Sequence, residues 1–102
     1  MVHLLFAVKD IKTNTFNRPF PESNRINAIR GLSIVVNDKQ TQIAHFPQDF
    51  ELFEVGTFDD ETGHINTKVE FVASAYSLQQ LGKEIDKNEN SKVNDGVNKD
   101  VK

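Results

Sequence analysis

Histidines are the first side chains to consider for acid–base or metal chemistry, and the chain has three of them. His3, His45 and His64 are far apart, and none belongs to an HxH or HxxxH pair that would place two imidazoles on one metal ion. The sequence also lacks a GxxxxGK(S/T) phosphate loop, a GxGxxG nucleotide motif and a GxSxG nucleophile motif. We therefore expect a protein with no catalytic residues, no cofactor and no bound metal.

Carboxylates are the second group that could do chemistry. Asp59, Asp60 and Glu61 are consecutive and precede a Thr-Gly pair. They could hold Mg²⁺ or Ca²⁺, but a calcium loop spreads its oxygen ligands over about twelve residues, and acids followed by Gly are typical of a hairpin turn. Glu51 and Glu54 could act as an acid and a base. Both lie on a predicted strand, where we expect them to be exposed and solubilising.

Basic and aromatic residues interleave in the first half of the chain, a pattern that suits single-stranded nucleic acid. Cations neutralise phosphates, and aromatic rings stack on bases. The best candidate is the segment Thr15-Phe16-Asn17-Arg18-Pro19-Phe20, in which either Phe could stack a base or fill the core instead. The candidate nucleic-acid-binding residues are Lys9, Lys12, Phe16, Arg18, Phe20, Arg25 and Arg30.

The charge is unevenly distributed along the chain. Residues 1–45 have a net charge of +3, residues 46–78 of −6 and residues 79–102 of zero, which together give the formal charge of −3. This excludes a strongly basic coat for nucleic acid but leaves room for a local contact. Asp59, Asp60 and Glu61 are candidate partner-binding residues for a basic protein, and a bipolar surface also permits self-association.

Length and composition bound the architecture. The chain has 102 residues, no Cys and no apolar run that approaches the 18 residues of a membrane helix. All eight Phe and the single Tyr lie before residue 77. We predict one small domain over residues 1–78, in a cytosolic protein. Residues 79–102 have no aromatic side chain, and we predict a polar, disordered tail there, although Val93, Val97 and Val101 recur at helical spacing.

The hydropathy pattern predicts an α+β fold. Residues 2–8 alternate as in a strand, residues 10–24 are loop-like, and residues 26–36 fit a helix capped by Ser23 or Asn24, although the run 34–36 also has strand propensity. Residues 38–49 form a connector. Residues 50–58 and 65–73 read as two strands joined by a hairpin loop, with Gly63 in the left-handed conformation. The predicted order is β-α-β-β: a small antiparallel sheet made of the N-terminal strand and the C-terminal hairpin, with one helix.

Several short blocks also resemble a known family when taken in order. They are Phe6-Ala7-Val8-Lys9-Asp10, Phe16-Asn17-Arg18-Pro19-Phe20, Ala28-Ile29-Arg30, Pro47-Gln48-Asp49-Phe50-Glu51-Leu52-Phe53-Glu54-Val55-Gly56 and Phe58-Asp59-Asp60-Glu61-Thr62-Gly63. Over about residues 4–75 the chain resembles the small nonstructural protein of gokushoviruses, which are microviruses with single-stranded DNA genomes. It departs from the family at Phe46-Pro47-Gln48-Asp49, where relatives typically have a His-Pro-Glu-Asp-like stretch.

The resemblance implies a nonstructural phage protein that is made in the host bacterial cytoplasm and is absent from the mature virion. It further implies a role in single-stranded genome replication or packaging, with binding to single-stranded DNA as the suggested means, and it supplies no catalytic residues. An alternative is an adaptor that docks its acidic hairpin on the viral replication initiator, the procapsid or a host factor. A homo-oligomer is compatible with either function.

Overall fold

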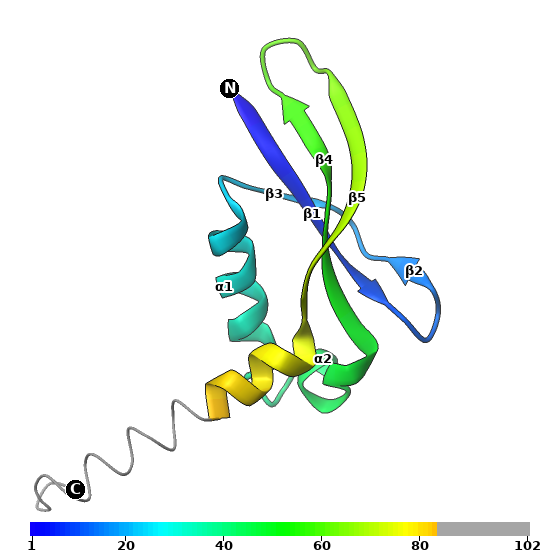
Figure 1. Cartoon of the computed structure of the whole chain (residues 1–102), viewed down its shortest axis with the longest axis vertical. Helices are drawn as coiled ribbons and strands as arrows, with labels where there is room; N and C mark the ends of the chain where they lie inside the picture. Colours follow the sequence, from blue (N-terminus) through cyan, green and yellow to red (C-terminus); the bar gives the residue numbers. More distant parts are fainter. Residues whose placement is uncertain (84–102) are drawn as a thin grey trace, which may run out of the picture.

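The computed structural model describes residues 1–83 and contains one twisted antiparallel sheet. Its long strands are β1 (Val2–Asp10), β4 (Phe50–Asp59) and β5 (Ile65–Ser74), in the order β1-β4-β5 (Figure 1). β4 and β5 form the predicted hairpin, which projects beyond the helices. The α+β class and the pairing of the N-terminal strand with the C-terminal hairpin are therefore confirmed.

Helix α1 (Arg25–Val36) covers one face of the sheet. The side chain of Asn24 caps its start, because Asn24 Oδ1 accepts a hydrogen bond from the backbone N–H of Asn27 at 2.8 Å. Its buried residues follow the helical repeat and pack on the strand residues that point to the same side. These core residues include Ala28, Leu32 and Val36 of α1 with Phe6, Val8, Phe50 and Leu52 of the sheet.

Two segments that were predicted to be irregular contain short elements. The loop 10–24 includes β2 (Thr15–Phe16) and β3 (Phe20–Glu22), which both pair with β1. The connector 38–49 includes α2 (Gln42–His45) and the 3-10 turn η1 (Pro47–Asp49). Pro21 is tolerated because β3 is a short strand at the edge of the sheet, where a missing N–H costs little.

A further helix, not predicted from the sequence, begins at residue 75 and includes the last described residue, Lys83. Ala75 and Leu78 enter the core, and the side-chain amide of Gln79 donates to the backbone carbonyls of Val36 at 3.1 Å and Ala44 at 2.8 Å. Residues 79–83 thus belong to a docked helix and not to the polar segment assigned to them. The rest of the predicted tail, with Val93, Val97 and Val101, lies outside the described residues.

Irregular pairing along β4 and β5 shifts the register of the sheet. Val55 is an extra residue of β4 in its pairing with β1, and β5 has extra residues opposite Val55 and at Val72 in its pairing with β4; each of them shifts the register. Gly56 lies at one of these shifts, and a Cβ on Gly56 would come within 2.2 Å of the backbone oxygen of Asn66. Only glycine allows this close approach between β4 and β5.

Candidate nucleic-acid interface

The face of the sheet opposite α1, called the outer face here, carries a row of aromatic rings. Directly paired residues share a face, so the pairs Lys9–Phe16, Ala7–Phe53 and Phe53–Phe71 place these side chains together, away from the core. The Phe16 and Phe53 rings meet edge to face with centroids 5.4 Å apart, and Phe53 and Phe71 meet in the same way at 5.9 Å. The three rings form an aromatic ladder across β2, β4 and β5.

The ladder is accessible and has one cation beside it. Phe16 is 43% exposed and Phe71 is 53% exposed. Lys9 Nζ lies 5.5 Å from the centre of the Phe16 ring and 5.9 Å from that of Phe53, within cation–π range. Such an arrangement offers flat apolar surfaces to bases and a positive charge to a phosphate.

The structure separates the seven candidate nucleic-acid-binding residues into two groups. Lys9 and Phe16 lie on the outer face, Lys12 is exposed in the turn between β1 and β2, and Arg18 is exposed between β2 and β3. These four residues lie near one end of β1.

The other three candidates lie elsewhere. Phe20 turns inward, where it packs on the core and its ring lies 6.2 Å from that of Phe6. Arg25 is at the start of α1 and holds carboxylates of β4 and β5, and Arg30 is exposed on α1, on the helix side of the sheet. The two Phe of the best candidate segment therefore differ: Phe20 is a core residue and Phe16 is a surface residue.

The expectation that Glu54 would be exposed is wrong. Its side chain is 6% exposed, because Glu54 points toward α1 and into a four-charge cluster. Glu54 accepts hydrogen bonds from Arg25 Nε at 2.7 Å and pairs with Lys68 Nζ at 3.0 Å, while Glu70 pairs with the same two cations. Burial alone would raise the pKa of Glu54, but the bonds from Arg25 and Lys68 outweigh it and hold the pKa below its ordinary value.

The acidic hairpin is closed by its own carboxylates and by the N-terminus. Gly63 has φ +77° and its N–H donates to the Asp59 carbonyl at 2.7 Å, as expected for a left-handed glycine closing the loop. The Asp59 side chain accepts from the Glu61 N–H at 2.9 Å. The predicted turn role of these acids is therefore confirmed.

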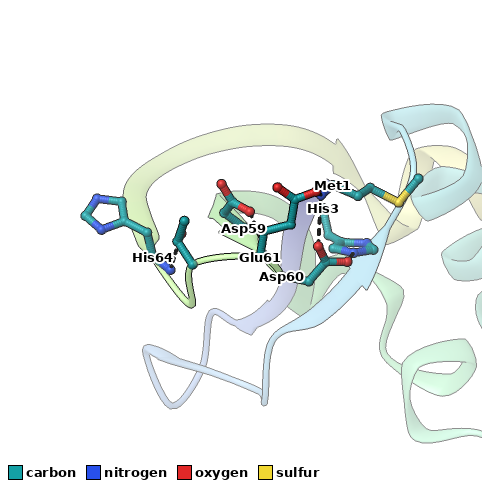
Figure 2. A network of polar contacts seen from close by, with 7 residues as sticks. Met1, His3, Asp59, Asp60, Glu61 and His64 are labelled. Carbon is teal, nitrogen blue, oxygen red and sulfur yellow. Dashed lines mark hydrogen bonds and ion pairs between the residues drawn. The ribbon is translucent and has the colours of Figure 1, made fainter.

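Asp60 joins the hairpin to the first strand (Figure 2). It lies 2.8 Å from the terminal ammonium of Met1 and 2.9 Å from His3 Nε2. The hydrogen bond from the ammonium, helped by that from His3, lowers the pKa of Asp60. Glu61 Oε2 makes a longer contact with the Met1 ammonium, at 3.4 Å, and its side chain is 81% exposed. The His64 side chain points away from Met1, His3 and Asp60 (Figure 2).

Concave sites occur on the helix side of the molecule. A hollow of about 510 Å³ lies where α1, α2 and the helix from residue 75 meet, and an apolar hollow of about 260 Å³ lies against Val8, Phe20 and Leu32. Within residues 1–83, no three His, Asp or Glu side chains are grouped as metal ligands, and no helix there is long and apolar enough to cross a membrane.

Sequence reasoning missed Phe53 and Phe71 as members of the ladder. Both lie on predicted strands. Strict alternation along residues 65–73 puts Ile65, Val69, Phe71 and Ala73 on one apolar face, a pattern typical of a strand that packs on the core. In the structure only Ala73 of these four packs against the core, and the other three are each more than half exposed. The excess of apolar residues on both faces of β4 was the signal that could have revealed a second apolar surface.

The described residues define a small α+β protein whose sheet is covered by helices on one face and displays aromatic rings on the other. The chain belongs to the Phage ORF5 protein family, whose model matches residues 3–78. Comparisons with curated proteins and with solved structures find no match.

Proposed function

We propose that this phage protein is a non-enzymatic, nonstructural factor of a gokushovirus-like microvirus that assists single-stranded genome replication or packaging by binding single-stranded DNA. The observation that carries the proposal is the ladder Phe16–Phe53–Phe71, whose two outer rings are exposed and whose central ring is half-buried, with Lys9 against it. Because of this role, we place the protein in the host bacterial cytoplasm and outside the mature virion.

The binding surface follows from the geometry of the outer face. Bases stack on Phe16, Phe53 and Phe71, while Lys9, Lys12 and Arg18 neutralise phosphates at the Phe16 end of the ladder. Arg25, Arg30 and Phe20 lie on the helix side, so they take no part in this surface. Stacking tolerates any base, so we expect little sequence preference, and duplex DNA hides its base faces and binds more weakly.

Fluorescence anisotropy with a labelled oligothymidine tests the proposal. Phe71→Ala removes one exposed ring of the ladder, and a stacked base is worth about 1–3 kcal/mol, or about 5- to 150-fold in Kd. Phe46→Ala is the matched control, because Phe46 is 56% exposed and its ring lies beside His45, away from the ladder. Equal loss of affinity in both variants, or no binding by the folded unsubstituted protein at low salt, would refute the proposal.

A protein adaptor that uses the acidic hairpin is the second candidate. One observation favours it: Glu61 stays 81% exposed at the tip of a hairpin that projects beyond the helices. Glu61→Lys is then expected to abolish capture of a purified replication initiator or capsid protein. The same variant leaves binding to oligothymidine unchanged if DNA is held by the outer face.

A further inference from the structure

Strand β5 forms one long edge of the sheet. It has ten residues, and within residues 1–83 it pairs only with β4. Its residues 65–71 are all exposed, and Val69 is 67% exposed at the middle of the strand. The pairing with β4 shifts register at Lys68 and Val69, but the edge has no proline and presents backbone donors and acceptors that another strand can pair with.

The charges on β5 are complementary to themselves. Lys68 and Glu70 flank Val69, so an antiparallel pair of β5 strands centred on Val69 places each Lys68 directly opposite Glu70 of the second copy. A centre at residue 68 or 70 would instead place Lys68 opposite Lys68, or Glu70 opposite Glu70. Shifting one strand by a single residue would place the apolar side chains of one copy on the same side of the sheet as the polar side chains of the other. The charges of β5 therefore favour the register centred on Val69 over the registers centred on residues 68 and 70.

We propose that the protein forms a homodimer in which β5 pairs antiparallel with β5 of a second copy, with the two-fold axis at Val69. Opposed residues of an antiparallel pair share a face, so the outer faces of both copies lie on the same side. The two aromatic ladders then become parts of one surface, joined at Val69 and Phe71. The dimer does not depend on DNA binding. If single-stranded DNA binds to the outer face, the dimer doubles the length of DNA that the surface can hold.

Cysteine cross-linking tests the register directly, because the chain has no cysteine of its own. In the proposed dimer, two copies of residue 69 face each other at about 5 Å between Cβ atoms, whereas two copies of residue 65 are about 27 Å apart along the strands. Val69→Cys and Ile65→Cys are therefore a matched pair, since Ile65 is also exposed, at 56%. Each variant is treated with a short bis-maleimide in the absence of DNA.

We expect Val69→Cys to form covalent dimer at least about tenfold faster than Ile65→Cys, as the separations require. Light scattering on the unsubstituted protein is expected to give the mass of a dimer. A monomeric mass at high protein concentration overturns the inference. So does equal cross-linking of the two variants, or a dimer whose Val69→Cys form does not cross-link. Because no DNA is present, these results are separate from those that decide the proposed function.

Discussion

Replacing Glu54 by Gln tests the four-charge cluster of Arg25, Glu54, Lys68 and Glu70, in which only Glu54 is buried. Gln keeps the shape of the side chain and removes its charge, so Arg25 and Lys68 lose one of the two carboxylates that they share. Breaking a fully buried ion pair costs about 3–5 kcal/mol. Here the side chains of Arg25 and Lys68 are 42% and 46% exposed and Glu70 remains beside them, so we expect about 1–2 kcal/mol. That loss lowers Tm by about 5–15 °C in a domain of this size.

The pH dependence of this difference has a definite sign. The folded protein lowers the pKa of Glu54 from its ordinary value of 4.5, so the stabilisation by its charge is fully present above pH 4.5 and is lost as the pH falls through the lower, folded pKa. Urea unfolding of the two proteins at a series of pH values measures the difference. Other carboxylates are common to both chains and cancel.

We expect the unsubstituted protein to be more stable than Glu54→Gln at pH 7 and the gap to close in acid, where Glu54 is protonated and resembles Gln. A gap that is the same at pH 7 and in acid, or a Glu54→Gln protein as stable as its parent at pH 7, would show that the charge of Glu54 does not stabilise the fold.

Two further predictions concern glycine positions and salt. Gly56→Ala is expected to destabilise the folded protein by about 1–3 kcal/mol or more, because the added Cβ would meet the Asn66 carbonyl. Gly31→Ala, which has open space around it in α1, is expected to stabilise the folded protein by about 0.5–1 kcal/mol. Thermal melts that rank the two variants otherwise contradict the geometry. If Lys9, Lys12 and Arg18 contact three phosphates, raising salt from about 50 to about 200 mM lowers affinity for oligothymidine about 20-fold. Lys9→Ala is expected to reduce that salt dependence by about a third, and an unchanged slope would remove Lys9 from the surface.

Much of the fold could be predicted from local patterns. Strand alternation, the Asn24 cap and the turn at Gly63 each depend on residues close in sequence, and each lies where it was expected. The helix from residue 75 was missed because residues 79–83, which lie beyond the last aromatic residue, continue into a polar segment that resembles a tail. Docking of Gln79 on the carbonyls of Val36 and Ala44 is a long-range contact that no local pattern reports.

The site was harder to predict, because it depends on which face of each strand is covered. Lys9 and Phe16 were recognised by type, but nothing in the loop 10–24 distinguished the inward Phe20 from the outward Phe16. Alternation along β4 places Glu54 on the same face as Phe50 and Leu52, and Phe53 on the other face. On β5, the register shift near Val72 places Phe71 opposite Phe53 and Ala73 opposite Leu52, on different faces of the sheet. Such shifts come from strand pairing and not from the sequence of one strand.

The central claim is that single-stranded DNA lies on the outer face of the sheet. The most direct measurement is an NMR titration of isotopically labelled protein with oligothymidine, followed through the aromatic and amide signals. The account predicts the largest shifts at Phe16, Phe53, Phe71 and Lys9, with Arg30 on the helix side unaffected. Shifts confined to α1 or to the acidic hairpin, or no shifts at saturating oligothymidine, would contradict it.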